Sequence, residues 1–259
     1  MLCAWKTPAR WRACQWMAVT SLALCAHPVE GQSAREILEQ VDQLLRGDSS
    51  RGLVSMEITT EHWSRSLEME VWSFGAEHSL VRVQSPAREA GTATLKAGQE
   101  VWNYLPRVDR TIKVPPSLMM GSWMGSHFTN DDLVKESSIV DDYDFEIAYE
   151  GQRDGVVVWE FSLIPKPEAP VVWGRVVEQV RQSDMMPTWV RYYDEDGELV
   201  RTIEFSGYRT MSGRLVPATM NVLPADKPEE RTTLIYHDLD FDVDIDESFF
   251  SLRSLRARR

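Results

Sequence analysis

Cysteine is missing from most of this chain, because Cys3, Cys14 and Cys25 all lie in its first tenth. Residues 32–259 therefore have no disulfide, no zinc thiolate and no cysteine nucleophile. Their four histidines never show the H-x-x-x-H or H-E-x-x-H spacing of a zinc site. The G-x-S-x-G, Walker and G-x-G-x-x-G patterns are also missing. We therefore predict a protein that is not an enzyme and that needs no cofactor.

Basic residues are scarce, with 28 Lys and Arg against 40 Asp and Glu, for a formal net charge of −12. No basic stripe is available to neutralise phosphates, so we expect no nucleic-acid partner. The same net charge argues against electrostatic docking on anionic lipid. Residues 32–259 contain no run of 18 apolar residues, so no transmembrane helix is predicted there.

The first 31 residues have the order of a secretory signal. Three basic residues precede an apolar stretch, roughly Trp16 to Ala26, which Pro28 and the small residue Gly31 follow. The apolar stretch is shorter than the ~20 residues that span a bilayer, although an uncleaved N-terminal anchor is the alternative. Lipidation at Cys25 is disfavoured, because a large leucine precedes it. We expect residues 1–31 to be a signal peptide and residues 32–259 to fold as a single domain in the periplasm.

Residues 33–45 repeat their apolar side chains at helical spacing, with Ser33 and Glu36 in a capping-box pattern and Gly47 as the stop. Beyond them the alternation changes to two, the period of β-strands. The predicted strands are Ser66–Trp72, Leu80–Gln84, Val101–Leu105, Phe145–Tyr149, Val156–Ile164, Thr188–Tyr193, Leu199–Phe205, Leu215–Val222 and Thr232–Leu239, with Gly174–Asp184 as a further strand or a short helix.

Tight turns such as Asp154-Gly155, Asp196-Gly197 and Ser212-Gly213 separate these strands. Nine or ten strands so joined predict one large antiparallel sheet in a mostly β, α+β fold. A sheet of that size must curl or be covered. The covers that the sequence offers are the N-terminal helix and residues 112–138.

Residues 114–130, here called the lid segment, contain no charged side chain. Methionine and aromatic residues dominate it, and two glycines interrupt it. One interpretation is a movable apolar lid over the sheet, and the other is a buried helix that plugs the core. Thr129 is predicted to cap a short helix whose first turn contains Asp131 and Asp132.

Two stretches resemble one known family. They are Trp102-Asn103-Tyr104-Leu105-Pro106 with Asp109-Arg110, and Met124-Gly125-Ser126-His127-Phe128 running on to Asp132-Leu133. Together they resemble the signature of the LolA-like outer-membrane lipoprotein-sorting proteins, and the ending Asp246–Leu252 resembles that family's closing motif.

The resemblance implies a curved, incomplete β-barrel whose mouth is covered by a few helices. It implies a periplasmic or outer-membrane-associated location. It also implies that a lipid or the acyl chains of a lipoprotein lie between sheet and lid. Members of this branch are often linked to lipid-exporting membrane transporters, so an inner-membrane exporter is an expected partner.

We therefore predict a lipid or lipoprotein carrier with an apolar cavity, a shape that suits acyl chains. A sensor or adaptor of a transporter or regulator, as in RseB-like relatives, is the alternative, and an enzyme acting on lipid or peptidoglycan is disfavoured. The predicted ligand-binding residues are Trp72, Trp102 and Tyr104 in strands, and Leu118, Met119, Met120, Trp123, Met124 and Phe128 in the lid segment.

Five aspartates alternate with apolar residues between His237 and Asp246. A calcium site is one interpretation, and a strand with one wet face is the other. The second is favoured because calcium ligands come from folded loops. Arg201, Arg209 or Arg214 is the expected cross-strand counter-charge.

Overall fold

The computed structural model describes residues 33–135, 142–167, 169 and 172–257, and within them thirteen antiparallel strands form one sheet. The signal peptide predicted at residues 1–31 lies outside this range. No helix among the described residues has the length and apolar character needed to cross a bilayer.

The strands are β1 (Ser49–Thr59), β2 (Ser64–Phe74), β3 (His78–Ser85), β4 (Ala93–Ala97), β5 (Glu100–Leu105), β6 (Arg110–Lys113), β7 (Tyr143–Arg153), β8 (Val156–Pro165), β9 (Arg175–Arg181), β10 (Pro187–Tyr193), β11 (Leu199–Met211), β12 (Arg214–Pro224) and β13 (Arg231–Phe241).

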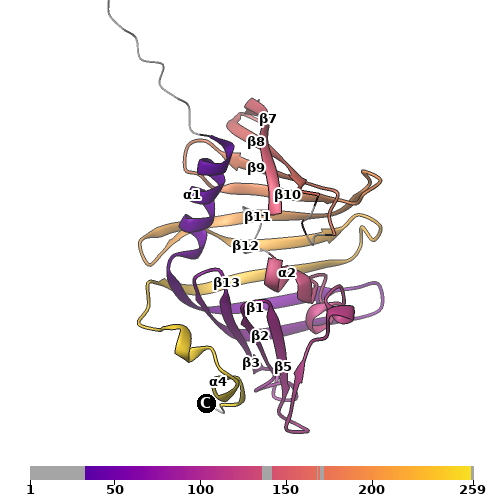
Figure 1. Cartoon of the computed structure of the whole chain (residues 1–259), viewed down its shortest axis with the longest axis vertical. Helices are drawn as coiled ribbons and strands as arrows, with labels where there is room; N and C mark the ends of the chain where they lie inside the picture. The colour runs from indigo at the N-terminus through magenta and orange to yellow at the C-terminus, as the bar shows by residue number, and fades with distance from the viewer. Residues whose placement is uncertain (1–32, 136–141, 168, 170–171, 258–259) are drawn as a thin grey trace, which may run out of the picture. The chain divides into compact units, whose positions relative to one another are not determined.

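The strands run in the order β6-β5-β4-β3-β2-β1-β13-β12-β11-β10-β9-β8-β7 (Figure 1). Two antiparallel meanders, β1–β6 and β7–β13, are thus joined by the pairing of β1 with β13. The edge strands β6 and β7 do not pair with each other, so the sheet is an incomplete barrel. The predicted fold class is confirmed.

The prediction of nine or ten strands is too low. It omits β4 and β6, which are five and four residues long and too short to show a clear alternation. It also omits β1, although Val54, Met56 and Ile58 alternate there with exposed or partly exposed residues. Residues 174–184, left open between strand and helix, contain β9.

The predicted N-terminal helix is confirmed as α1 (Ala34–Arg46). The side chain of Ser33 accepts a hydrogen bond from the backbone N–H of Glu36, and the Glu36 carboxylate accepts one from the backbone N–H of Ser33. Gly47 ends the helix with φ +66°, a conformation that glycine adopts without strain.

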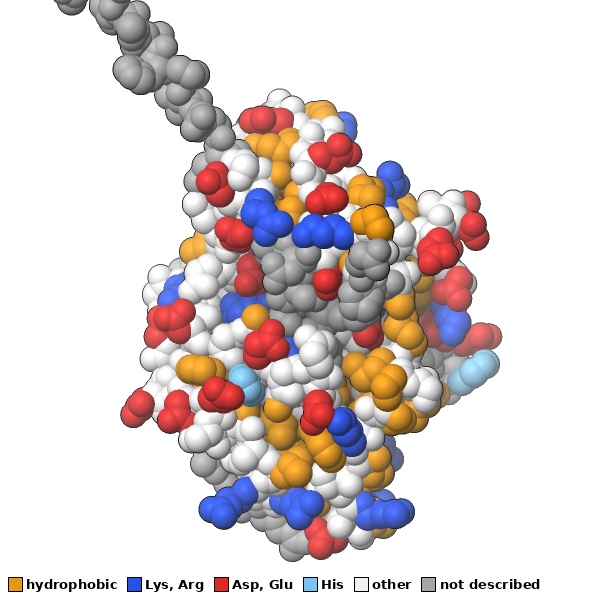
Figure 2. All heavy atoms as spheres, in the orientation of Figure 1, with side chains coloured by type: hydrophobic (Ala, Val, Ile, Leu, Met, Phe, Trp, Pro, Cys, Tyr) orange, Lys and Arg blue, Asp and Glu red, His pale blue; other side chains and the backbone are white. Residues whose placement is uncertain are grey.

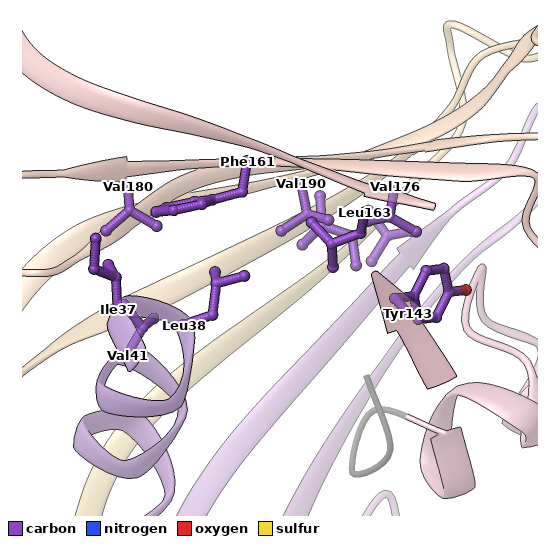
Figure 3. Close-up of a cluster of buried hydrophobic side chains, with 11 residues drawn as sticks. Ile37, Leu38, Val41, Tyr143, Phe161, Leu163, Val176, Val180 and Val190 are labelled. Carbon is purple, nitrogen blue, oxygen red and sulfur yellow. The ribbon is translucent and has the colours of Figure 1, made fainter. Parts of the chain in front are cut away.

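One face of the sheet holds two apolar clusters, each under its own cover. In the first, here called the α1 cluster, the buried face of α1 packs on strands β7 to β12 (Figure 3). In the second, the lid cluster, the lid segment packs on β1, β2 and β3. The α1 cluster contains Ile37, Leu38, Val41, Tyr143, Phe161, Leu163, Val176, Val180, Val190, Ile203 and Val222; the lid cluster contains Val54, Met56, Ile58, Leu67, Met69, Val83 and Trp123.

The opposite face of β2 to β5 is covered by the C-terminal segment. This segment contains the short 3-10 turn Glu247–Phe249 and α4 (Leu252–Arg256), which contacts β4 and β5. Phe250 and Leu255 are buried there against strand residues. Both faces of this half of the sheet are therefore covered.

The aspartate-rich stretch is a strand only as far as Phe241, because Asp242 takes φ +53° and turns the chain. Asp242 pairs with Arg214 at 2.5 Å, as expected. Arg209 instead donates to backbone carbonyl oxygens of β13. Arg201, another of the three candidates, pairs with Asp132.

Candidate functional site

The lid segment begins the connection between the two edge strands of the sheet. Because β6 and β7 lie at opposite edges, the chain that leaves β6 must cross one face before β7 begins. It does so through two 3-10 turns, Pro116–Leu118 and Trp123–Gly125, and then α2 (Asn130–Lys135), which Figure 1 shows in front of the sheet. The second interpretation is therefore wrong in expecting one continuous helix in the lid segment.

Trp123 is the point at which the lid segment enters the core. Its side chain is 5% exposed and packs in the lid cluster. Its indole N–H donates to the hydroxyl of Thr94 at 3.1 Å, so the buried polar atom has a partner. Phe128, five residues later, packs against both the lid cluster and the α1 cluster. The lid segment thus spans the boundary between the two halves of the core.

The backbone of the lid segment is folded on itself by hydrogen bonds. The N–H of Trp123 donates to the carbonyl of Phe128 at 2.7 Å, and the hydroxyl of Ser126 donates to the carbonyl of Trp123 at 2.7 Å. The side-chain amide of Asn130 donates to the carbonyls of Leu118 and Gly121 at 3.1 Å each. Irregular backbone can be buried here because its polar groups are satisfied locally.

Met124 adopts a left-handed conformation, with φ +52° and ψ +23°. Such a conformation is uncommon outside glycine and costs about 1 kcal/mol. Its carbonyl accepts a hydrogen bond from Arg65 Nη1 at 2.9 Å. The strain therefore lies where the segment is attached to β2.

An ion pair between Asp132 and Arg201 attaches the lid end to the other half of the sheet. Two hydrogen bonds of 2.6 and 2.7 Å join the carboxylate to the guanidinium. The guanidinium also lies over the rings of Tyr192 and Trp173, at 4.3 and 4.8 Å from their centroids. Burial opposes the charge of Arg201, yet the hydrogen bonds that this guanidinium donates to Asp132 raise its pKa above the usual value.

Asp132 has a second role, at the start of α2. Its carboxylate accepts from the backbone N–H of Thr129, and its own N–H donates to the Thr129 hydroxyl. This reciprocal capping box confirms the predicted cap at Thr129. One carboxylate therefore starts the helix and binds Arg201. The sequence signal for that partner is the position of Arg201 two residues before Ile203, which puts both side chains on the same buried face of β11.

A second polar contact ties the lid segment to β13 and the turn before it. The backbone N–H of His127 donates to the Thr232 hydroxyl at 3.0 Å, and the ring nitrogen Nδ1 lies 2.8 Å from the same oxygen. Nε2 lies 3.0 Å from the Glu230 carboxylate. The hydrogen bond from His127 is the main reason why the pKa of Glu230 lies below its usual range.

The nine predicted ligand-binding residues do not share one site. Trp72, Trp102 and Tyr104 point to the face opposite the lid segment. Trp72 pairs with Leu80, Leu80 with Leu95 and Leu95 with Trp102, so these side chains share one face. Thr94, which accepts the hydrogen bond from Trp123, precedes Leu95 by one residue and so lies on the other face. The three aromatic side chains pack instead under the C-terminal segment.

The other six residues lie on the lid side but differ in burial. Leu118 and Met120 are 57% and 48% exposed, whereas Met119 packs against Val101 and Val114. Met124 and Phe128 are partly buried beside Trp123. Figure 2 shows hydrophobic side chains gathered where the lid segment reaches the surface. In the described part of the chain, no three His, Cys, Asp or Glu side chains come together as metal ligands would.

A family model with the description "Uncharacterized protein" matches residues 75–257. No curated protein matches the chain by sequence. Among solved structures, a DUF1329 family protein from Desulfovibrio piger is 24% identical, with a TM-score of 0.76 over 85% of this chain and 97% of its own. A domain from Vibrio parahaemolyticus, assigned to outer membrane lipoprotein sorting, is 22% identical, with a TM-score of 0.74 over 86% and 98%.

A LolA superfamily protein from Nitrosomonas europaea is also similar, with 23% identity and a TM-score of 0.73 over 86% of this chain and 100% of its own. At these identities the likeness concerns the fold. The fold implied by the sequence motifs around Trp102–Pro106 and Met124–Leu133 is therefore confirmed as that of the LolA superfamily.

Proposed function

We propose that this chain is a carrier in the cell envelope. It belongs to the family whose model, described as "Uncharacterized protein", matches residues 75–257, and it has the LolA fold. It binds a lipid or the acyl chain of a lipoprotein between the lid segment and the sheet. It acts without catalysing a reaction.

The observation that carries this proposal is the way the lid segment covers the sheet. A charge-free segment with exposed apolar residues at one end, Leu118 and Met120, continues into a buried tryptophan at the other. Outward movement of Trp123 would uncover the apolar side chains of β1, β2 and β3. Each CH₂ of an acyl chain buried there contributes about 0.8 kcal/mol, so a single chain gives substantial affinity without a polar contact.

The ligand site in this proposal consists of the lid residues Met119, Trp123, Met124 and Phe128 and the sheet beneath them. Leu118 and Met120 form its outer rim. The location is the periplasm or the inner side of the outer membrane, reached by export and removal of residues 1–31. An inner-membrane lipid or lipoprotein exporter is the proposed donor.

Native mass spectrometry of the protein recovered from the envelope tests occupancy directly. We expect a co-purified lipid, and an intact mass that corresponds to cleavage near Gly31. Adding an acylated peptide should slow amide exchange in residues 114–130, because ligand binding favours the state that binds it.

Two matched substitutions separate binding from folding. Met124→Gln places a polar group beside Trp123 and should weaken binding of the acylated peptide severalfold. Val157→Gln introduces the same polar group at an exposed position of β8, outside the proposed ligand site, and should have little effect. The carrier proposal would be overturned if both variants bound the acylated peptide as tightly as the unchanged protein and the peptide did not slow amide exchange in residues 114–130.

The second candidate is an envelope sensor or adaptor that uses this fold without lipid transfer. The network that holds the lid segment, from Asp132 with Arg201 to His127 with Thr232 and Glu230, favours it. An adaptor needs a fixed surface and no ligand. A protein that lacks lipid, and whose lid exchange stays slow under all conditions, would support the adaptor.

A further inference from the structure

The basic side chains of this acidic protein are concentrated at one end of the sheet. The hairpin Glu100–Lys113 and helix α4 together carry five basic and two acidic side chains, although the whole chain has a net charge of −12. Figure 2 shows Lys and Arg side chains at the lower end, where Figure 1 places α4 and the lower end of β5. We call these two segments the basic end.

Four arginines of the basic end face solvent without a counter-charge. They are all exposed, and none of them forms an ion pair with a described residue. The two acidic residues are already engaged: Glu100 pairs with Lys113, and Asp109 accepts a hydrogen bond from the Tyr104 hydroxyl at 2.9 Å. The net positive charge is therefore available to a partner. The four arginines are Arg107, Arg110, Arg253 and Arg256.

The two segments form one fixed surface. Arg256 Nε donates to the hydroxyl of Thr111 in β6 at 2.8 Å. The completely buried Leu255 holds α4 against β4 and β5. The relative positions of the arginines are thus set by packing.

Exposed aliphatic side chains lie among these arginines. Val108, at the tip of the hairpin, is 61% exposed, and Ile112 is 44% exposed. Leu105 and Leu252 are also exposed. Single exposed apolar residues are ordinary, but four of them within two short basic segments form an amphipathic surface.

We propose that the basic end docks on an anionic phospholipid bilayer, with the arginines at the headgroups and Val108 at the acyl boundary. A basic and aliphatic surface is the kind that binds at such an interface. A projecting hairpin tip with aliphatic side chains fits an acidic protein less well, because protein interfaces are anchored by aromatic side chains in pockets. The net charge of −12 argues against docking of the protein as a whole. It does not apply to the basic end, where basic side chains outnumber acidic ones.

The test uses the exported form of the protein, its N-terminus defined by intact mass, and flotation with vesicles. We expect binding to phosphatidylglycerol vesicles that weakens as salt is added, and little binding to phosphatidylcholine vesicles. The double variant Arg107→Gln, Arg110→Gln should bind about twenty-five-fold less, since each arginine near an anionic surface contributes about fivefold. Val108→Ser should bind about tenfold less, with an unchanged salt dependence.

Arg175→Gln with Arg191→Gln is the matched control, because both arginines are exposed on β9 and β10 and form no ion pair with another described residue. This control should bind like the unchanged protein, and all variants should melt alike. Equal losses in the control and the test variant would overturn the proposal. The proposal would also be overturned if the protein did not bind vesicles but was retained on polyglutamate, with retention that depends on Arg107 and not on Val108. That result would indicate an acidic protein partner.

This docking surface is independent of the proposed carrier. Its residues lie outside the lid cluster, so a protein that lacks lipid but still binds vesicles refutes only the carrier. A protein that contains lipid but does not bind vesicles refutes only the docking.

Discussion

The two covers on the core face of the sheet are held in different ways. Helix α1 is amphipathic, and its buried residues Ile37, Leu38 and Val41 fix it by apolar packing. The lid segment has irregular backbone. Besides the apolar packing of Trp123 and Phe128, directed polar contacts hold it, chiefly Asp132 with Arg201 and His127 with Thr232. Apolar packing is lost gradually with distance, whereas a hydrogen bond is lost as soon as its partners separate. We therefore expect the lid segment to be released from the sheet more readily than α1.

Removing the Arg201 guanidinium should have the largest effect on the lid side. Arg201→Met leaves the Asp132 carboxylate without its counter-charge, at a cost of about 3–5 kcal/mol in the free energy of unfolding. Amide exchange in residues 114–135 should rise more than exchange in the strands. Urea denaturation and hydrogen exchange measure the two effects.

Arg209→Met is the control for that change, because Arg209 lies on the same strand and is exposed. We expect it to cost less than about 1 kcal/mol. If both variants lose the same stability and exchange in residues 114–135 is unchanged, the ion pair does not hold the lid segment.

Truncating a buried side chain of α1 should act on the whole fold. Ile37→Ala removes a residue that is 2% exposed, at a cost of about 3 kcal/mol. Exchange should then rise across strands β7 to β12 together, without a selective rise in the lid segment. Leu44→Ala, at an exposed position of the same helix, should cost well under half as much. A selective opening of residues 114–130 in Ile37→Ala would remove the distinction between the covers.

Gly125 offers a smaller and more local test. It takes φ +75°, and a Cβ there would lie 3.7 Å from Arg65 Nη1, an ordinary contact. The cost of Gly125→Ala, about 1 kcal/mol, is therefore a backbone cost alone. Gly98→Ala has the same backbone problem at φ +58° with no atom within 4 Å. We expect similar melting temperatures for the two variants and faster lid exchange only for Gly125→Ala.

The two sides should also respond to opposite extremes of pH. Burial, with a smaller contribution from nearby aspartates, raises the pKa of Tyr143 from 10.0 to about 12. The folded state thus holds the proton more tightly, so this contribution to stability is complete below pH 10 and is lost as the pH rises towards 12. Tyr143→Phe should flatten that alkaline loss in melting curves.

On the lid side the sign is reversed. The hydrogen bond from His127 lowers the pKa of Glu230 below 4.5, so the folded state holds this proton less tightly. The contribution is present above pH 4.5 and is lost as the pH falls through the lowered pKa. Glu230→Gln should remove part of the acid sensitivity of lid exchange and leave the alkaline loss in place. An unchanged acid response would show that this contact is not a tether.

Much of the fold follows from local patterns in the sequence. The capping box of Ser33 and Glu36, the glycine stop at Gly47 and the period-two alternation of β8 and β12 depend on neighbours in the chain. So does the cap at Thr129. Short strands such as β6 escape such patterns, because four residues allow only two alternations.

The sequence by itself determined that the covers exist and which residues are apolar. The tertiary structure alone decided their sides and partners. Strand register put Trp72, Trp102 and Tyr104 on the face under the C-terminal segment, because a shift of one residue reverses every side chain. Chain crossing brought Asp132 to Arg201, sixty-nine positions away, and gathered the arginines of β6 and α4 at one end. Contacts between such distant residues leave no periodic trace in the sequence, so only the folded chain reveals them.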